Sequence, residues 1–490
     1  MAASAECQSL LLALPDPCLL AVLQCCAAGD QRSLLSAARA HSRLHQTAVL
    51  ALRSITAVVH QQQKVRSVLL YLARHGKQVD CIDLIGDQTS LSVHQLPPNL
   101  QLSSLQLEQL LLGLHPGNGI HGVLRGPSDT MALKKLRLSS CDLLSEGLAA
   151  PNEDLAAALS LLPTDMEHLS ISRLTCGSRS VQFPTALLQQ LQQLTYLELA
   201  DVEIHGPDKA SPALQPLQAM TRLVDLRLQC YTWTPINASM LSGIQHLTRI
   251  QLCRSSVEPG ALAGKTQLQH LELAACHVPG GAAGTAQLLS HLQPLEQLTH
   301  LNLTRSVQDV WADTPSASAF AALTASSKLH HLDISCNTLP AGVWHHMFPA
   351  GRQLAHLTAL NITGALHPSG QYAAAPEGRL LSCCPSLQSL KMMSLQLEGL
   401  LRELLGLSGL RTLVVTGGPD NLLQLTQLKQ LTSLMFYGGE YLELTCRVSC
   451  EVTSGAVCCV TYQLLVVVPC HSACALHIVR HLLPASLARQ

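Results

Sequence analysis

Histidines recur at one position of a repeated apolar phrase, and each is followed two residues later by an acidic or amide side chain. The histidines are His270, His300 and His331, and the residues that follow them are Glu272, Asn302 and Asp333. A stack of imidazoles beside carboxylates could bind a metal ion, or it could change its charge near pH 6. The alternative is a plain polar surface for a protein partner, since repeats duplicate one residue type at one position. We predict the protein-binding surface and no metal site.

Charged and aromatic residues occupy the same two positions in the copies that come earlier in the chain. They are Lys135, Arg137, His168, Tyr196, Glu198, Asp225, Arg227 and Arg249. Both signs of charge are interleaved, and a mixed surface of this kind suits protein recognition. The surface lacks the regular aromatic residues on which the bases of single-stranded nucleic acid stack. We therefore predict that these residues, together with the histidines, bind a protein partner.

The phrase that positions these residues is Leu-x-x-Leu-x-Leu, with related apolar residues allowed at each place. It begins thirteen times, at Leu102, Leu133, Met166, Leu194, Leu223, Leu247, Leu268, Leu298, Leu329, Leu357, Leu387, Leu410 and Leu431. A weaker copy begins at Val79. If each copy is a strand, its second and third apolar residues point to one face, and the variable residues between them point to the other.

The regular recurrence of this phrase resembles the pattern of the leucine-rich repeat family, in which the period is about 20–29 residues. The resemblance covers residues 78–445, where the copies lie about 27 residues apart on average. It implies an α/β solenoid of about 13–14 repeats, in which a curved parallel sheet alternates with helical return segments. The spacers 186–194 and 288–295 carry leucines at helical spacing. The concave face of the sheet is the expected binding surface.

Departures from the family pattern occur just after the expected strands. The asparagine that the family places there stands clearly only at Asn337, while Cys141 and Cys276 hold the equivalent place in two other copies. Intervals between copies range from 21 to 33 residues. We therefore expect uneven curvature along the array.

Residues 8–58 do not repeat, and they carry two amphipathic stretches separated by Gly29-Asp30. The pattern predicts a small helical hairpin, followed by a linker helix at 59–77. It resembles the F-box, a short helical module that docks on the Skp adaptor of a cullin–RING ubiquitin ligase. The matching residues, which the resemblance implies would contact the adaptor, are Leu14, Pro15, Leu19, Leu20, Val22, Leu23, Leu34, Leu35 and Leu44.

The resemblance implies a substrate-recognition subunit of a ubiquitin ligase, with a Skp adaptor and a cullin as partners and the repeats holding a protein target. One alternative shares the same fold. Residues 8–58 could be only an N-terminal cap, because a repeat array must cover the core of its first repeat. The chain would then be a repeat scaffold with no ligase role.

After Leu444 the phrase stops, and residues 446–490 are rich in cysteine and histidine. The spacing Cys470-His-Ser-Ala-Cys474 differs from the usual two-residue spacing of zinc ligands, and no second pair completes it. Three interpretations fit this segment. It is a divergent cap, a loosely ordered apolar tail, or a retained intron translated in frame.

Composition narrows the classes of function. Lys plus Arg is 31 and Asp plus Glu is 32, which gives no electrostatic footprint for nucleic acid or an anionic membrane. The N-terminus lacks the pattern of a secretory signal, so we expect a cytoplasmic or nuclear location and reduced cysteines. No phosphate-binding loop, dinucleotide fingerprint or nucleophile elbow is present. We therefore predict a non-enzymatic protein without a cofactor.

Overall fold

The computed structural model describes most of the repeats and short parts of the two ends of the chain. The described residues are 14–29, 43–44, 47–48, 53–86, 92–93, 100–113, 133–144, 151–176, 179–205, 214–306, 315–365, 382–392, 403–416, 425, 428, 430–438, 442–450 and 460–467. The chain divides into two compact units, Met1–Thr232 and Trp233–Gln490. Within the described part, no helix is long and apolar enough to cross a membrane.

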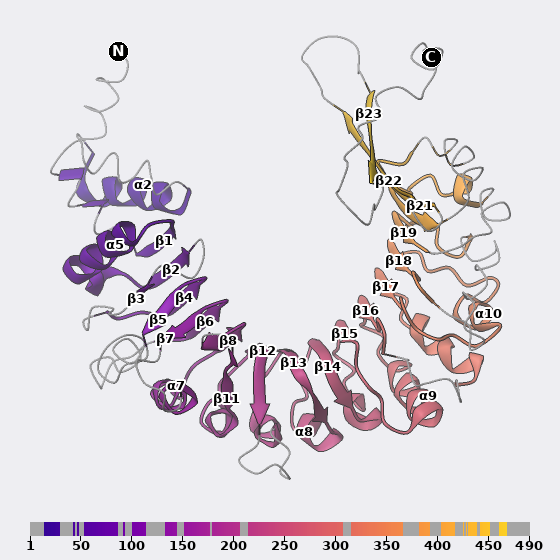
Figure 1. The fold of residues 1–490 in the computed structure, drawn as a ribbon, viewed down its shortest axis with the longest axis horizontal. Coiled ribbons are helices and arrows are strands. Elements are labelled where there is room, and N and C mark those ends of the chain that lie inside the picture. Colours follow the sequence, from indigo (N-terminus) through magenta and orange to yellow (C-terminus); the bar gives the residue numbers. More distant parts are fainter. Residues whose placement is uncertain are drawn as a thin grey trace, which may run out of the picture. The chain divides into compact units, whose positions relative to one another are not determined.

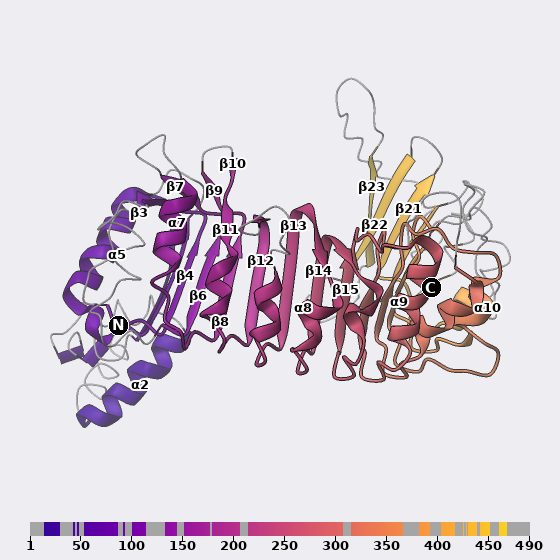
Figure 2. The same ribbon diagram turned by 90° about the horizontal axis from the view of Figure 1, so that it is seen from below.

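The first unit is built on parallel strands, one for each copy of the phrase (Figures 1 and 2). In order of pairing they are β1 (Ser54–Val59), β2 (Cys81–Gly86), β4 (Ser104–Glu108), β6 (Lys135–Ser139), β8 (His168–Ser172), β12 (Tyr196–His205) and β13 (Asp225–Ile236). A second, smaller sheet follows the same repeats and contains β3 (Ser92–Val93), β5 (Leu111–Gly113), β7 (Asp142–Leu144), β9 (Thr175–Cys176) and the antiparallel β10 (Arg179–Ser180). Strand β11 (Gln182–Pro184) pairs in parallel with β12.

Helices of the first unit precede the sheet or connect its strands. They are α2 (Asp16–Gly29), α5 (Gln62–His75) and α7 (Pro151–Leu159), with the short 3₁₀ helices η1 (Gly76–Gln78), η2 (Thr185–Gln189) and η3 (Gln215–Ala219). Helix α5 falls where the linker helix was expected. The spacer 186–194, which carries leucines at helical spacing, forms only the short η2, in which Leu187 and Leu188 are buried.

The second unit repeats the same plan, with strands of three residues at β16 to β19. Its parallel strands are β14 (Arg249–Val257), β15 (His270–Ala274), β16 (His300–Asn302), β17 (His331–Asp333), β18 (Ala359–Asn361), β19 (Ser389–Lys391), β20 (Thr412–Thr416) and β21 (Ser433–Gly438). The return segments contain α8 (Ala238–Ser242), η4 (Pro259–Leu262), α9 (Gly281–Leu292), η5 (Ala317–Thr324) and α10 (Val343–Met347). Figure 1 shows α9 and α10 on the side of this unit opposite the strands.

Leucines at the second apolar place of the phrase form the core of each unit. Strand pairing sets Leu169 between Leu136 and Leu197, and it sets Leu301 opposite Leu332, so that one side chain stacks on the next. Each of these leucines has an exposed fraction of 0%. Burial of a leucine side chain contributes roughly 1.5–3 kcal/mol. Parallel strands and stacked leucines make each unit an array of leucine-rich repeats, as the spacing of the phrase predicted.

The residue seven positions after the start of the phrase adopts a left-handed backbone conformation in repeat after repeat. It has φ between 50° and 57° at Gln109, Ser140, Arg173, Asp201, Arg254, Ala275, Arg305 and Cys336. The next residue occupies the place of the family asparagine. The amide nitrogen of Asn337 donates to the carbonyls of Leu303 and Ile334, at 2.8 and 2.9 Å. This side chain closes the turn by supplying a donor that the backbone lacks.

Cysteine and serine take over that role in other copies. The Cys141 thiol donates to the Leu107 and Ser139 carbonyls at 3.4 and 3.3 Å, and its burial raises its pKa to about 11. The Ser306 hydroxyl likewise donates to the carbonyl of Leu273. Cys141 and Ser306 therefore keep the hydrogen bond to a preceding strand and change only the group that donates it.

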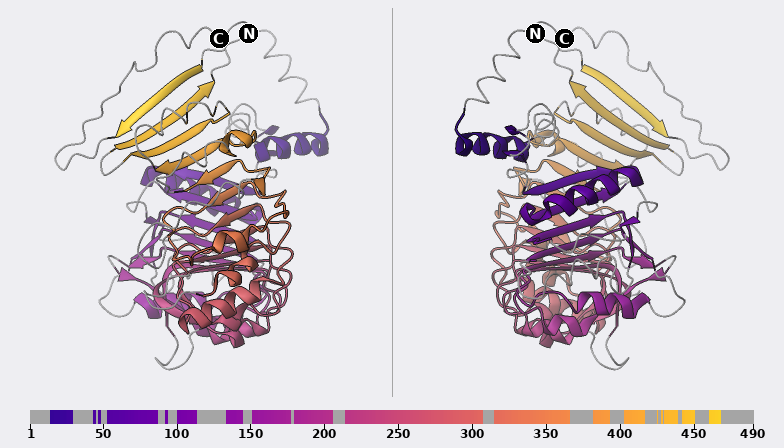
Figure 3. Two further views of the ribbon diagram at one scale, coloured as in Figure 1. Left: turned by 90° about the vertical axis from the view of Figure 1, so that its right-hand side faces the viewer. Right: turned by 90° about the vertical axis from the view of Figure 1, so that its left-hand side faces the viewer.

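Two boundaries differ from those expected. Residues 54–58 were assigned to the helical segment, but Ser54–Val59 is strand β1 and pairs in register with β2. The sequence contains the phrase here as Leu52-Arg-Ser-Ile55-Thr-Ala57, with a small third apolar residue that concealed it. The boundary at 445/446 falls inside β22 (Leu442–Cys450), which pairs antiparallel to β21 and to β23 (Val460–Val467) (Figure 3). The remaining residues of the tail lie outside the described part.

Candidate protein-binding surface

The variable residues of the phrase form two parallel rows on the strand face of each unit. The first polar row holds the residue before the second apolar place, and the second polar row holds the residue after it. In the first unit, register sets Lys135, His168, Tyr196 and Asp225 side by side in the first row. It sets Arg137, Ser170, Glu198 and Arg227 side by side in the second row. The sequence-predicted residues of this unit therefore lie on one continuous surface.

A stack of three flat side chains lies at the centre of this surface. The rings of His168 and Tyr196 are 3.9 Å apart at their centroids, with an angle of 6° between their planes. The guanidinium carbon of Arg227 lies 5.1 Å from the centroid of the Tyr196 ring. Tyr196 belongs to β12, between β8 and β13, so each neighbouring strand contributes one member of the stack. Aromatic and arginine side chains of this kind often carry much of the binding energy of protein interfaces.

Hydrogen bonds hold the stack in place. Arg227 donates from Nε and Nη2 to the Asp225 carboxylate at 3.1 and 2.9 Å. The Tyr196 hydroxyl donates to Oε2 of Glu198 at 2.9 Å, and the Ser170 hydroxyl donates to the same oxygen at 2.6 Å. A surface whose side chains are already fixed loses less conformational entropy when a partner binds.

Burial and nearby charges shift the titration of the stacked groups. Burial raises the pKa of Tyr196, and the Glu198 carboxylate raises it further. The hydrogen bond to Asp225 raises the pKa of Arg227. Burial lowers the pKa of His168, and the Lys135 ammonium lowers it further. Near pH 7 the stack is therefore a neutral imidazole, a neutral phenol and a guanidinium paired with a carboxylate.

The neighbouring strand β6 carries two cations that project into solvent. Lys135 and Arg137 are both exposed, and neither forms an ion pair with a residue that the structure describes. The adjacent Lys134 differs, because its ammonium lies 2.7 Å from Asp165 Oδ2 and 3.5 Å from Glu167 Oε1. Lys135 and Arg137 thus remain available to acidic groups of a partner beside the fixed stack.

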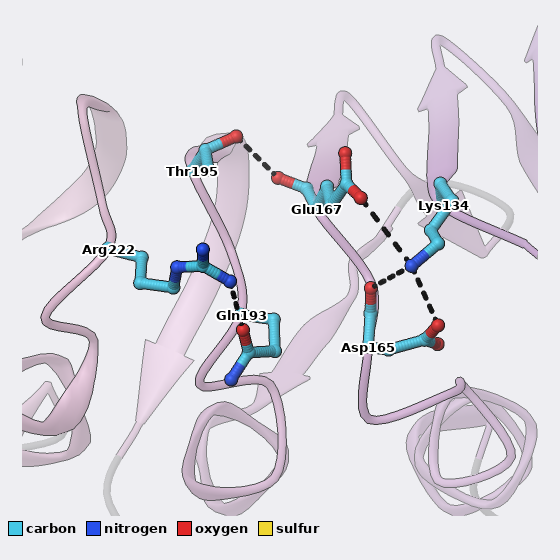
Figure 4. A pocket seen from close by; sticks show the side chains of 6 residues that line it. All are labelled: Lys134, Asp165, Glu167, Gln193, Thr195 and Arg222. Atoms are coloured by element: carbon cyan, nitrogen blue, oxygen red, sulfur yellow. Dashed lines mark hydrogen bonds and ion pairs between the residues drawn. The ribbon is translucent and has the colours of Figure 1, made fainter.

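An open pocket of about 380 Å³ lies where the strands of the first unit begin (Figure 4). Its lining residues are Lys134, Asp165, Glu167, Gln193, Thr195 and Arg222. They bond to one another: Arg222 donates to the side-chain oxygen of Gln193, and the Thr195 hydroxyl donates to the Glu167 carbonyl at 3.0 Å. The lining side chains are therefore linked in two groups, Lys134 with Asp165 and Glu167, and Arg222 with Gln193.

The strand face of the second unit carries the remaining predicted residues in the same two rows. Arg249, His270, His300 and His331 follow one another in the first row. Glu272, Asn302 and Asp333 follow one another in the second row. Within the described part of the chain, no group of three or more His, Cys, Asp or Glu side chains is placed to hold a metal ion.

Some of the residues expected to contact the adaptor are buried and others are exposed. Leu19, Leu23 and Leu44 are buried, at 0, 3 and 7% exposure. Pro15 and Val22 are exposed, and Leu14 and Leu20 are intermediate, while Leu34 and Leu35 lie outside the described residues. The Arg43 guanidinium donates to the Leu14 carbonyl at 2.7 Å and to Asp16 Oδ1 at 2.6 Å, which ties residue 43 to the start of α2.

Sequence reasoning missed two residues of the first unit's surface. Ser170 holds Glu198, although nothing in its type distinguishes it from any exposed serine. Oδ1 of Asp83 is buried without a hydrogen-bond partner among the described residues. Burial raises the pKa of Asp83, and the Glu108 carboxylate raises it further. The weaker copy at Val79 places Asp83 in the second polar row, and that position could have identified it.

Comparison with known proteins finds likeness to solved structures alone. No protein-family model and no curated protein matches the chain. An internalin from Listeria monocytogenes has a TM-score of 0.41 and 16% identity, over 68% of this chain and 86% of its own. A leucine-rich repeat protein from Leptospira interrogans has a TM-score of 0.41 and 17% identity, over 80% of each chain. A plant peptide hormone receptor, solved in complex with RGF2, has a TM-score of 0.39 and 14% identity, over 79% of this chain and 63% of its own.

Proposed function

We propose that this chain is a non-catalytic protein-binding repeat protein whose strand face in the first unit holds a protein partner. The stack of His168, Tyr196 and Arg227 carries the proposal, because it is a rigid aromatic and guanidinium surface at the centre of a mixed-charge face. Lys135 and Arg137 beside it favour a partner with acidic groups near its contact residues.

Site-specific photo-cross-linking tests this role. A photoreactive amino acid in place of Arg137 should cross-link a defined protein from the protein's own cells, and Tyr196→Ala should reduce the yield at least about tenfold, as expected for loss of a central contact residue. The control carries the same photoreactive amino acid in place of Gln218, which is exposed on η3. Equal yields at the two positions, or no effect of Tyr196→Ala, would contradict the proposal.

We further propose that residues 8–58 dock a Skp-type adaptor, which would make the chain a substrate-recognition subunit of a cullin–RING ubiquitin ligase in the cytoplasm or nucleus. Two features support this. Helix α2 begins at Asp16, directly after Leu14-Pro15, as the resemblance to the F-box implies. Val22 is an apolar residue of α2 with 40% of its surface exposed, and it could contact another protein.

Binding to purified Skp adaptor at micromolar concentration tests the ligase role. Val22→Asp should weaken binding at least about tenfold, since it places a charge in an apolar contact. Leu70→Asp is the control, because Leu70 is a 60% exposed leucine of α5, which lies outside residues 8–58. If the wild-type chain binds no adaptor, the alternative holds, in which residues 8–58 only cap the array. The buried Leu19 and Leu23 are compatible with that alternative.

A further inference from the structure

The second unit presents a row of three imidazoles, which we call the histidine row: His270, His300 and His331. The rings of His270 and His300 are 4.9 Å apart, and those of His300 and His331 are 5.9 Å apart. Their planes differ by 25° and 22°, so the three rings form a continuous stack across β15, β16 and β17. Register ends the row at Ala359 on β18, which has no polar side chain.

Positive charge dominates the surroundings of the central imidazole. His300 is exposed. Burial lowers the pKa of His300, and His331, His330 and Arg249 lower it further, so no carboxylate offsets these effects. His330, which stands directly before β17, also lies 5.6 Å from the ring of His356.

The carboxylate nearest to His331 is hydrogen-bonded elsewhere. Oδ1 of Asp333 accepts from the hydroxyls of Thr304 and Ser335, at 3.1 and 2.6 Å. Oδ2 of Asp333 accepts from the Asn361 amide at 2.7 Å. Burial lowers the pKa of His331, Asp333 raises it, and Lys391 on β19 lowers it. Glu272, on the strand of His270, is the other carboxylate of the second polar row in the described strands β14 to β21.

We infer that the histidine row is a contact surface for an acidic, extended segment of a protein partner, and that this segment binds more tightly at pH 5.5 than at pH 7.5. Charge complementarity favours this occupant, since protonated imidazoles beside Arg249 and Lys391 attract carboxylates. The row spans two strand spacings, about 10 Å, and alternate side chains of an extended segment lie about 6.7 Å apart. Two carboxylates of such a segment can therefore contact the row together. The inference rests on the proposed protein-binding role of the strand faces.

Proton uptake links binding to pH. In the free protein His300 and His331 resist protonation, because burial lowers the pKa of both and a charged neighbouring imidazole lowers that of His300 further. Carboxylates of a bound segment reverse this effect and raise the pKa of the same groups. Binding therefore takes up protons, and by linkage the affinity increases as the pH falls below the ordinary histidine value of about 6.5.

Fluorescence anisotropy with the full chain tests the inference. The probe is a fluorescein-labelled peptide of alternating aspartate and serine, and a peptide of alternating asparagine and serine is its neutral control. Affinity for the acidic probe should rise at least about fivefold between pH 7.5 and pH 5.5, as uptake of about one proton allows. The variant His300→Gln/His331→Gln should reduce this rise to less than about twofold.

The matched control variant is His345→Gln/His346→Gln. Both histidines are exposed on α10, which lies opposite the strands in Figure 1. This variant should keep the full pH response. Circular dichroism at pH 5.5 confirms that each variant is folded.

A pH-independent affinity, an unchanged response in His300→Gln/His331→Gln, or equal binding of the neutral peptide would overturn the inference. Equal binding of single-stranded DNA with the same net charge would do so as well, because the row would then be a general anion surface. Cross-linking at residue 137 tests partner binding by the first unit. If cross-linking succeeds and the affinity for the acidic peptide does not change with pH, the inference about the histidine row is wrong and the proposed function still stands.

Discussion

His168 shows how one residue can report on the electrostatics of the strand face. Its pKa is lowered by burial first and then by Lys135. We predict that Lys135→Gln raises the pKa of His168, measured by NMR titration of the imidazole Cε1–H. Lys134→Gln is the matched control, because that ammonium is held by Asp165 and Glu167 and should leave His168 unchanged. Equal shifts in the two variants would show that Lys135 does not act on this ring.

The same shift has a consequence for stability. The unfolded chain takes up a proton at His168 near pH 6.5, whereas the folded chain takes it up at a lower pH. The contribution of His168 to the free energy of unfolding is therefore fully present above about pH 6.5. It is lost as the pH falls from there to the folded-state pKa. Urea unfolding should show a smaller loss between pH 7 and pH 5 in His168→Gln than in the wild type.

Asn337 tests the side-chain hydrogen bonds that close the turn after β17. It is 1% exposed, and it donates to two backbone carbonyls. Asn337→Ala should lower the free energy of unfolding by about 2 kcal/mol, since it leaves buried carbonyls without that donor. Asn337→Ser should cost less, because Ser306 makes the equivalent bond in a neighbouring repeat. A serine variant as unstable as the alanine variant would show that the hydroxyl cannot replace the amide.

At the scale of the elements, the return segment contains a buried lysine just after η4. Lys265 is 1% exposed, and its ammonium donates to the Leu241 carbonyl at 2.7 Å. That carbonyl also accepts from the Ile244 amide at 3.0 Å, so it keeps a partner if the lysine is removed. The side chain therefore matters chiefly as apolar volume, while its burial lowers the pKa of its ammonium.

Two substitutions separate the volume of Lys265 from its charge. Lys265→Met should leave the free energy of unfolding within about 1 kcal/mol of the wild type or raise it, because a buried charge is replaced by an apolar chain of similar size. Lys265→Ala should lower it by about 2–4 kcal/mol through the cavity that it leaves. Both values come from urea unfolding at pH 7. Equal losses in the two variants would instead assign the stability to the ammonium.

The elements also show where sequence reasoning succeeded. The phrase predicted the parallel strands β2, β4, β6, β8 and β12 to β21 and the positions of their polar residues, because a period of two along each strand decides which side chains share a face. It missed β1, where Ala57 replaces a larger apolar residue. It could not predict the antiparallel β22 and β23, because their pairing with β21 does not depend on the repeated phrase.

At the scale of the whole molecule, a repeat array confines the effect of a mutation to nearby repeats, because each repeat contacts only its neighbours. Leu332→Ala should increase amide hydrogen exchange in β16, β17 and β18, measured by mass spectrometry. The strands of the first unit should exchange as in the wild type. Leu70→Ala, at a 60% exposed position of α5, is the control and should change neither region. Uniform loss of protection would show that the two units unfold as one.

The sequence by itself determined the repeat, the apolar stack and the membership of the two polar rows, since these follow from spacing and strand geometry alone. Only the tertiary structure decided which charges are already paired. Arg227 is held by Asp225 and Lys134 by Asp165, whereas Lys135 and Arg137 project into solvent. Lys134 and Asp165 are 31 residues apart and meet because neighbouring repeats stack, whereas Arg227 and Asp225 share β13 and pair through the rotamers that packing selects. No spacing rule contains that information.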